Sequence, residues 1–512
     1  MLLGLLSLAL CGLVAWIAYA RMKINKMAEL SEQLPGPQTI PLLGNARDLG
    51  GLNPNAQPKD FFDATMMDLA KKYGSLYRLW VGTNLFVILS DPDLIEVILS
   101  SNVQLDKGTN YKFTFPWIGD GLLTSTGTKW KKHRRIITPT FHFKILEDFV
   151  EVFNYNGKKM IEKLKEKADG QEIDIYPYVS LCALDIIAET AMGISINAQD
   201  NNEADFVKAT RNMARIIVWR SFKPWLQWGW LMQLLPTGRL QRRSLAVLHA
   251  LSSQVIKSRK TEFLNKQKHN AASGGAGDDN DVGAKKRRAF LDMLLEAAED
   301  NLTLTDQELR EEVDTFMFEG HDTTTSGTSF TLSSLSLHPD IQERAYEEQQ
   351  AIFGDSDREA TYQDLQEMKY LEKVIKETLR LFPSVPMFVR CINEDVKLGE
   401  YTLPKGCNIT ISPMILHRNE KYFPDPERFD PERFSSENSQ RRHPYQYIPF
   451  SAGPRNCVGQ KFAMLEMKAT VSKVLRSFRM LPGSTTNQFP ELVGELVLKN
   501  LHGMRMKLVS RK

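Results

Sequence analysis

The chain has 512 residues and a mass of 58.4 kDa, enough for one large domain or several average ones. Its 65 Lys and Arg residues nearly balance 62 Asp and Glu, and a net charge of +3 argues against a dedicated nucleic-acid binder. With 42% apolar and 25% charged residues, the composition excludes a disordered or collagen-like chain. The five cysteines show no paired C-x-x-C spacing, which excludes a disulfide framework or structural zinc site and favours a reducing compartment.

The N-terminus begins with an apolar run without a charge, residues 2–20. As a helix rising about 1.5 Å per residue, this run would span about 28 Å, close to one bilayer core. Arg21, Lys23 and Lys26 follow it directly, and basic residues on this side favour a retained signal-anchor over a cleaved signal peptide. The sequence therefore predicts a transmembrane signal-anchor at 1–20, a basic and proline-rich linker at 21–40, and a catalytic domain at 41–512 that faces the cytosol.

The catalytic domain combines a few short strands with many helices. Apolar and β-branched residues around a Gly-Thr-Asn turn predict a hairpin at 76–89. Helical periodicity predicts long helices at 141–167, 244–266, 309–337, 368–381 and 458–478. Short strands are expected at 396–403 and 407–412, and the low-complexity segment 271–284 is expected to be an exposed loop. The expected fold is mainly α with a small β part, in the α+β class.

The most specific segment is Phe450-Ser-Ala-Gly-Pro-Arg-Asn-Cys457-Val-Gly459. A single thiolate from Cys457 is a soft axial ligand suited to haem iron. Gly453 and Gly459 would let the backbone approach the sulfur closely, and the helix expected after Cys457 would lower the pKa of the thiol. Phe450 would shield the sulfur, and Arg455 offers a guanidinium to a carboxylate such as a haem propionate.

A second polar segment interrupts a long predicted helix, at Glu312-Val-Asp-Thr-Phe-Met-Phe-Glu-Gly-His-Asp-Thr-Thr-Thr325. The Thr323 hydroxyl can donate to the carbonyl of Glu319 and bend the helix locally. A local opening that holds a hydroxyl and the Asp322 carboxylate suits proton delivery to dioxygen beside a haem. The alternative interpretation is an N-cap-like Asp-Thr pair at a helix break.

The cysteine segment resembles the haem-binding loop of the cytochrome P-450 superfamily. The E-x-x-R motif of that superfamily is matched by Glu377-Thr-Leu-Arg380, whose two charged side chains share one helix face. Its third partner in the family is an arginine of a P-E-R-F segment. Arg428 and Arg433 both fit this description, and distance to the cysteine loop favours Arg433. The resemblance implies that Glu377, Arg380 and Arg433 form a structural network around the ligand loop.

Two further motifs match positions that bind the haem propionates in this superfamily. Trp130-Lys-Lys-His-Arg134 matches W-x-x-x-R, with Trp130 and Arg134 on one helix face, and Arg390 matches a second position. The resemblance implies that these three residues bind the haem. His133, between them, is interpreted as a helix-surface residue.

All thirteen positions from Glu312 to Thr324 resemble the signature of the fourth cytochrome P-450 family, the fatty-acid ω-hydroxylase group of microsomal enzymes from insects and other animals. The resemblance spans nearly the whole chain. It implies that Thr323 and Asp322 support cleavage of the O–O bond. It also implies that Glu319 becomes an ester to a haem methyl, with a free carboxylate as the alternative.

The resulting expectation is a membrane-bound haem-thiolate monooxygenase of the endoplasmic reticulum with haem b and O2. It would hydroxylate a fatty acid or similar lipophilic chain at or near the terminal carbon. The resemblance implies electrons from NADPH through NADPH–cytochrome P-450 reductase, with cytochrome b5 as a second candidate donor. The alternatives are a broad oxygenase of hormones, terpenoids or xenobiotics, and a non-catalytic haem lipid carrier or sensor.

Two surfaces are candidate contacts. Basic residues flank the haem motifs and could dock an acidic electron donor, with simple solvation as the alternative: Lys129, Lys131, Lys132, Arg135, Arg441, Arg442 and Lys461. The tryptophan-rich segment 223–235 could enter the membrane interface, or it could be an ordinary core or pocket-roof segment.

Overall fold

The computed structural model describes residues 11–12, 27–40, 43–201, 204–272, 289–299, 304–484 and 490–511. The predicted signal-anchor at 1–20 lies outside the described residues apart from 11–12, and so does the low-complexity segment apart from 271–272. Among the helices that the structure describes, none combines the length and apolar character needed to cross a membrane.

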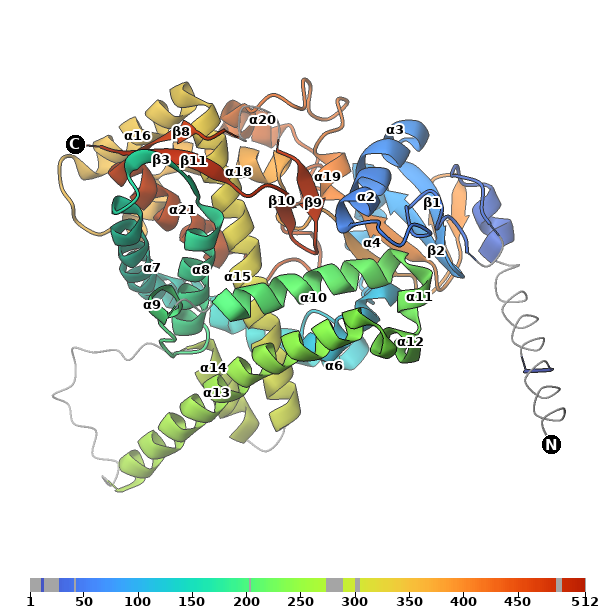
Figure 1. Ribbon diagram of the computed structural model, residues 1–512, viewed down its shortest axis with the longest axis horizontal. Coiled ribbons are helices and arrows are strands. Elements are labelled where there is room, and N and C mark those ends of the chain that lie inside the picture. Colours follow the sequence, from blue (N-terminus) through green and yellow to red (C-terminus); the bar gives the residue numbers. More distant parts are fainter. Residues whose placement is uncertain are drawn as a thin grey trace.

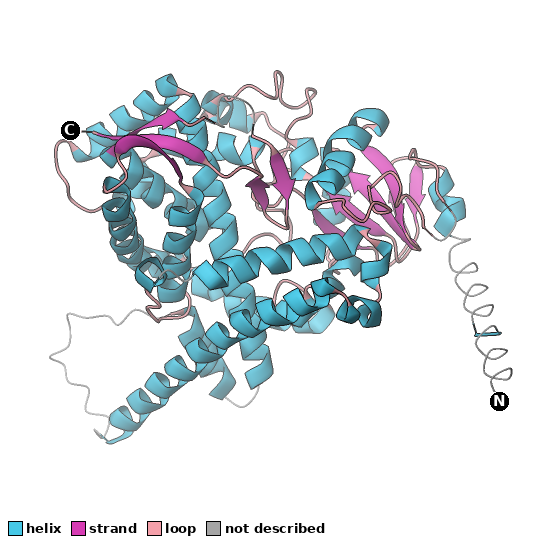
Figure 2. Cartoon of the chain, viewed as in Figure 1, coloured by secondary structure: helices cyan, strands magenta, loops and turns pink. Residues whose placement is uncertain are grey.

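A small β-rich part lies at one end of the molecule, beside a larger helical part (Figures 1 and 2). Its four-stranded sheet has the order β1 (Leu76–Val81), β2 (Asn84–Leu89), β7 (Asn408–Ile411), β4 (Phe388–Cys391). The hairpin predicted at 76–89 is confirmed as β1 and β2, and Gly82 adopts the positive φ that its tight turn needs. β7 pairs in parallel with β2, so a strand from late in the chain completes this sheet.

The remaining strands form three smaller sheets. One sheet has the order β3 (Asp169–Asp174), β11 (Arg505–Ser510), β8 (Phe478–Pro482). A second pairs β9 (Leu492–Gly494) with β10 (Leu498–Asn500). The third pairs β5 (Val396–Leu398) with β6 (Tyr401–Leu403). The strands predicted at 396–403 and 407–412 are confirmed as β5, β6 and β7.

Helix α15 (Asp306–Leu337) runs through the middle of the helical part (Figure 1). A capping box between Thr305 and Glu308 fixes its start. The helix packs closely against α8 (Tyr176–Thr190) and α21 (Gln460–Ser477), so most of its side chains are buried although many are polar. Its threonine hydroxyls donate to carbonyls four residues back, which satisfies polar groups that burial would otherwise leave without partners.

The five long helices predicted from periodicity are all present, as α7 (Phe143–Lys165), α13 (Pro236–Ala272), α15, α18 (Lys369–Leu381) and α21. The mainly helical fold with a small β part is therefore confirmed. The other helices are α2 (Pro58–Asp63), η1 (Ala64–Asp68), α3 (Leu69–Tyr73), α4 (Pro92–Leu99), η2 (Thr109–Phe113), α5 (Phe115–Ile118), α6 (Gly127–Ile137), η3 (Thr138–Phe141), α9 (Ala198–Asn201), α10 (Ala204–Phe222), α11 (Pro224–Gln227), α12 (Gly229–Leu234), α14 (Phe290–Glu299), α16 (Pro339–Phe353), α17 (Tyr362–Glu367), α19 (Pro413–Leu416), η4 (Pro431–Phe434) and α20 (Ser436–Gln440).

Candidate active site

A mostly apolar cavity of about 370 Å³ lies between α15, α6, the cysteine loop and the sheet formed by β1, β2, β7 and β4. The tip of the β9–β10 hairpin closes part of its wall with Leu496 and Val497. The cavity wall includes eight predicted site residues: Glu319, Thr323, Trp130, Arg134, Arg390, Phe450, Arg455 and Cys457. Segments hundreds of residues apart in the sequence therefore converge on one space.

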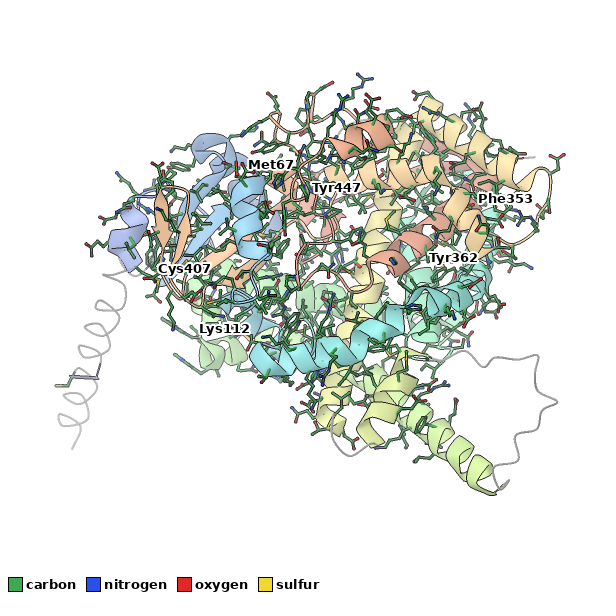
Figure 3. The ribbon with its side chains drawn as sticks, turned by 180° about the vertical axis from the view of Figure 1, so that it is seen from behind. Met67, Lys112, Phe353, Tyr362, Cys407 and Tyr447 are labelled. Atoms are coloured by element: carbon green, nitrogen blue, oxygen red, sulfur yellow. The ribbon has the colours of Figure 1, made fainter. Side chains whose placement is uncertain are left out.

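Cys457 sits in the loop before α21. Its backbone N–H donates to the carbonyl of Phe450 at 2.9 Å, which closes the loop into a compact turn. All five cysteines are free and fall within the described residues, and Cys457 is the one that lines the cavity. Cys407, labelled in Figure 3, lies in the β-rich part instead. Cys457 is therefore the single thiol available to a ligand in this space.

The two glycines of the cysteine loop, Gly453 and Gly459, differ in backbone conformation and in the space around them. Gly453 has a φ of 70°, and a Cβ atom there would lie 1.8 Å from the carbonyl oxygen of Leu99. Gly459 has an ordinary φ of −90°, and its nearest neighbour would be Phe141 at 3.7 Å. For Gly453 the prediction is corrected, because this glycine allows the loop to contact α4. The backbone of Gly459 does approach the sulfur, since its N–H interacts with the Cys457 thiol, although a Cβ atom there would not be crowded.

Burial dominates the ionisation of Cys457. It raises the pKa of the thiol to about 11, and the Glu319 carboxylate adds to the rise. The Gly459 N–H and Arg134 oppose this rise without cancelling it. The predicted lowering by the helix N-terminus is thus outweighed in the protein alone, because the apolar cavity disfavours a thiolate. A cation bound at the sulfur would restore the thiolate by displacing its proton.

Basic side chains dominate the charge of the cavity wall. Four basic residues, Lys107, Arg134, Arg390 and Arg455, face one acidic residue, Glu319. Arg390 is 2% exposed, and its Nη1 atom has no hydrogen-bond partner within the described residues. Burial lowers the pKa of Lys107 well below its usual value, and the charges of Arg390 and Arg455 lower it further. This excess of positive charge suits an anionic ligand with more than one carboxylate.

Arg134 and Arg455 also hold the loops around the cavity together. Arg134 donates to the carbonyl and the side-chain oxygen of Asn456, at 2.8 and 2.7 Å, and so fixes the residue next to Cys457. Arg455 donates to backbone carbonyls at positions 105, 122 and 123, and its guanidinium lies 4.8 Å from the ring centroid of Trp130. These arginines position the cysteine loop as well as charging the cavity.

Helix α15 contributes a carboxyl group and hydroxyl groups to the cavity. The side chain of Glu319 makes no hydrogen bond to another described residue, and burial raises the pKa of its carboxyl group to about 7 against the effect of Lys107. Thr323 donates to the Glu319 carbonyl at 2.6 Å, as the motif predicted. The neighbouring Thr324 also lines the cavity. A carboxyl group and two hydroxyls are thus available to a bound ligand.

The predicted network around Glu377 joins α18 to η4 and to the segment just before it. Arg380 makes two hydrogen bonds to Glu377, at 2.7 and 2.8 Å, and both side chains are fully buried. Arg433 lies 3.4 Å from the same carboxylate, whereas Arg428 contributes only its backbone carbonyl, which accepts from Arg380. Tyr447, labelled in Figure 3, joins the same region by donating to the carbonyl of residue 376.

The residues present fit a haem group. One thiol faces the cavity, and the described residues hold no cluster of three or more His, Cys, Asp or Glu that could bind a metal in another way. The unpaired Nη1 of Arg390 and the excess of basic residues match two propionates. When bound there, haem ligated by a thiolate supplies the activation of dioxygen.

Comparison with known proteins decides the family, because the family model for cytochrome P450 matches residues 34–504. The chain belongs to the cytochrome P450 family. Similar relatives include cytochrome P450 4c3 of Drosophila melanogaster, 43% identical over 506 residues, which cover 98% of this chain and 93% of the relative. Cytochrome P450 4d2 of the same species is 44% identical over 512 residues, covering 99% and 98%. Cytochrome P450 4V2 of Homo sapiens is 42% identical over 493 residues, covering 95% and 93%.

These relatives confirm the predicted membership of the fourth P450 family and the prediction of a monooxygenase. For a P450 enzyme, haem and O2 follow from the family, as do a redox partner and a lipophilic substrate.

Of the two residues predicted to be catalytic, Thr323 lines the cavity and Asp322 does not. Its carboxylate accepts a hydrogen bond from the Tyr176 hydroxyl at 3.0 Å and forms an ion pair with Lys499 at 3.1 Å. Burial alone would raise the pKa of Asp322, but Lys499 and the neighbouring His321 hold it below the usual value. The carboxylate is therefore ionised and points towards β10 and α8.

The interpretation of His133 as a surface residue is wrong. Its side chain is fully buried, and its Nδ1 atom lies 2.5 Å from Glu312, which also accepts from the N–H of Leu122. The many basic residues around His133 in the sequence of α6 led to the prediction that this residue is exposed to solvent. The spacing of His133 from Trp130 and Ile137 is the signal that could have revealed one buried face.

Lys107 and Tyr111 are cavity residues that the sequence analysis missed. The Lys107 ammonium lies 4.9 Å from the ring centroid of Tyr111, and the backbone of Lys107 pairs with that of Arg390 in an isolated bridge. The residues lie in a loop and in the short helix η2, without a motif of their own. No pattern in one sequence indicates that this loop meets β4.

Proposed function

We propose that this P450 hydroxylates a fatty acid at or near its terminal carbon. The observation that carries the proposal is the free carboxyl group of Glu319 in the wall of a mostly apolar cavity that also contains Cys457. An apolar cavity suits an alkyl chain. The relatives named above are about 40% identical to this chain over nearly its full length, which supports a reaction of the same family.

The overall reaction inserts one oxygen atom of O2 into a C–H bond and releases the other as water, with two electrons and two protons consumed. Within the cavity, Trp130, Arg134 and Arg390 would hold the propionates, and Cys457 would ligate the iron. The hydroxyl of Thr323 would hold or pass a proton at its Oγ1 atom. Apolar side chains such as Phe316 and Phe318 would exclude water from the substrate chain.

Terminal hydroxylation needs positional control, because internal C–H bonds are weaker than those of the terminal methyl group. A rigid cavity can present the methyl group alone to the reacting centre, and geometry then outweighs bond strength. The test is to reconstitute the full chain with reductase and NADPH and to offer saturated fatty acids of graded length. Mainly terminal products support the proposal, and mainly internal products contradict it. No product from any chain length, with a normal thiolate-type spectrum of the reduced CO complex, would favour hormones, terpenoids or xenobiotics as substrates.

We also propose that Glu319 forms an ester with a haem methyl group. An O–C bond forms at the Glu319 carboxylate, while the methyl carbon loses a proton and two electrons to the enzyme's own dioxygen chemistry. The accessible, unbonded carboxyl group of Glu319 supports this, because it is free to react. Acidic organic solvent should leave haem on the wild-type chain after turnover and remove it from Glu319→Gln. Glu308→Gln, which changes a glutamate at the start of the same helix, is the matched control and should retain the haem.

The electron donor and the location complete the proposal. NADPH–cytochrome P-450 reductase would deliver the electrons, with cytochrome b5 as a second donor, and residues 1–20 would anchor the chain in the endoplasmic reticulum. NADPH oxidation that depends on added reductase tests the donor. It also separates an enzyme from a haem-bearing lipid carrier or sensor, which would consume no NADPH. Co-sedimentation with endoplasmic reticulum membranes tests the location.

A further inference from the structure

A pair of ionisable side chains joins α6 to α15 outside the cavity wall. His133 of α6 and Glu312 of α15 are both fully buried, and neither lines the cavity. The carboxylate of Glu312 accepts a hydrogen bond from the Nδ1–H of His133, at 2.5 Å. Taking two ionisable groups out of water costs free energy that apolar residues of similar size would not cost, so this pair indicates a role beyond packing.

Glu312 also holds the segment 119–123, which precedes α6. Its Oε2 atom accepts from the backbone N–H of Leu122 at 3.1 Å. The segment lies directly against α15, because a Cβ atom on Gly121 would lie 2.7 Å from the Oγ1 atom of Thr315, so only glycine fits at this contact. One carboxylate therefore fixes both α6 and this segment against α15.

Both of these structures bear on the cavity wall. The carbonyl groups of Leu122 and Leu123 each accept from Nη2 of Arg455 at 3.1 Å, and Arg455 belongs to the cysteine loop. Helix α6 carries Trp130 and Arg134, which line the cavity. The Arg455 guanidinium lies 4.8 Å from the ring centroid of Trp130, so the two structures meet at the cavity. A displacement of either one would move side chains of the haem site.

We infer that Glu312 and His133 are positioning residues for haem binding. Together they fix α6, which carries Trp130 and Arg134, and the segment that holds the cysteine loop through Arg455. The inference rests on the proposed binding of the haem propionates by α6, and it does not depend on the identity of the substrate.

Further ionic contacts between α6 and α15 are weaker. Lys129 lies 3.2 Å from Glu311, but the lysine side chain is 29% exposed, and ion pairs open to solvent contribute little. The Nε2 atom of His133 lies 3.6 Å from Glu308, which is beyond hydrogen-bond distance. The position of α6 against α15 therefore depends mainly on Glu312.

The test uses the haem-loaded full chain before any exposure to NADPH, and it measures the rate at which haem passes to an excess of apomyoglobin. Glu312→Met fills similar space without accepting these hydrogen bonds, so it frees both α6 and the segment. We expect it to speed haem loss by about tenfold or more. Glu312→Gln restores an acceptor and should bring the rate back to within about threefold of wild type.

Asp185→Leu is the matched control for structural damage. Asp185 of α8 is also fully buried and accepts from the backbone N–H groups of Ala198 and Gln199, at 2.6 and 3.1 Å, but it does not line the cavity. The variant should lower the melting temperature and change the rate of haem loss by no more than about twofold. Equal acceleration by Asp185→Leu and Glu312→Met would overturn the inference, because haem loss would then follow general damage.

The resonance Raman bands of the haem propionates give a second readout and test the premise separately. Trp130→Phe keeps an aromatic ring but removes the indole N–H donor, so it should shift these bands if α6 binds a propionate. Glu312→Met should also shift them, and Asp185→Leu should leave them unchanged.

The failure of the premise and the failure of the inference give different results. Unchanged bands in Trp130→Phe would contradict propionate binding by α6 and overturn the inference with it. Shifted bands in Trp130→Phe, with wild-type bands and haem loss in Glu312→Met, would overturn the inference alone. If Glu312→Met takes up no haem, His133→Leu breaks one half of the pair, and wild-type bands and haem loss in that variant would overturn the inference.

Discussion

At the scale of single residues, the buried pair of Glu377 and Arg380 gives a sharp stability prediction. Arg380→Ala would leave the Glu377 carboxylate buried without its main partner, which costs about 3–5 kcal/mol of unfolding free energy. Arg428→Ala is the matched control, because Arg428 is exposed and contributes only its backbone carbonyl. Its effect should stay within about 0.5 kcal/mol. Denaturant unfolding of the haem-loaded protein measures the unfolding free energy of both variants. Equal losses in the two variants would contradict the role given to the Arg380 side chain.

Glu466 gives a pH prediction. The pKa of its carboxyl group is raised from an ordinary value of 4.5 to about 8, so the folded chain binds the proton more tightly than the unfolded chain. Stability from this group is therefore complete below pH 4.5 and is lost as the pH rises to about 8. The melting temperature of wild type should fall across this window more steeply than that of Glu466→Gln. Parallel curves would show that Glu466 titrates normally.

A site residue could be predicted from the sequence only where it belongs to a recognisable motif. Cys457, Glu319 and Arg390 stand in recognisable patterns, and all three line the cavity. Lys107 has no such pattern, and its role depends on a long-range contact between its loop and β4. Asp322 belongs to a motif, but Lys499, nearly two hundred residues later, turns it away from the cavity, and such tertiary partners cannot be predicted from one sequence.

At the scale of elements, the cysteine loop is held by its contact with α4. Gly453→Ala would place a methyl group on the Leu99 carbonyl at a φ that alanine rarely adopts, so the loop would have to move. We expect it to abolish the thiolate-type spectrum of the reduced CO complex. Gly459→Ala has room and an ordinary φ, and it should retain most of that spectrum. A normal spectrum from Gly453→Ala would contradict this account of the loop.

The basic residues that flank the haem motifs were a candidate docking surface for an electron donor, but not all of them are unpaired. Lys129 is ion-paired with Asp120 and Glu311, whereas Lys131 and Lys461 are exposed. Lys131→Glu and Lys461→Glu together should therefore raise the KM for reductase at low salt, with little change in hydroperoxide-driven activity. Lys397→Glu, a charge reversal at an exposed residue of strand β5, serves as the control and should leave this KM unchanged. No change with the double variant would place the docking surface elsewhere.

Regular elements could be predicted well where one pattern continues through them, as in β1, β2 and α18. The bounds of α13 could not, because it extends from Pro236 to Ala272, well beyond the predicted 244–266. Polar residues in its added turns hide the helical period. A proline in the first turn favours the start of a helix, but this signal alone is too weak to predict that α13 begins at Pro236.

At the scale of the whole molecule, the tryptophan-rich segment 223–235 has one side packed on the core and one side exposed. Trp225 packs against the main core, whereas Trp228 and Trp230 are 57% and 69% exposed on the surface around α12. Deletion of residues 1–20 should therefore release the protein from alkaline-washed membranes only partly. Adding Trp228→Ser and Trp230→Ser should release the remainder. Full release by the deletion alone would show that these exposed rings do not contribute.

Hydroxylation at the terminal carbon, as proposed, requires a haem in a fixed position beside the apolar cavity, with Glu319 as its proposed covalent attachment. The most direct measurement is the ratio of terminal to internal hydroxylation of one saturated fatty acid by wild type and by Glu319→Ala. We expect a terminal product to dominate in wild type and the ratio to fall severalfold in Glu319→Ala, with total turnover largely retained. An unchanged ratio, or a wild-type product that is mainly internal, would contradict the account.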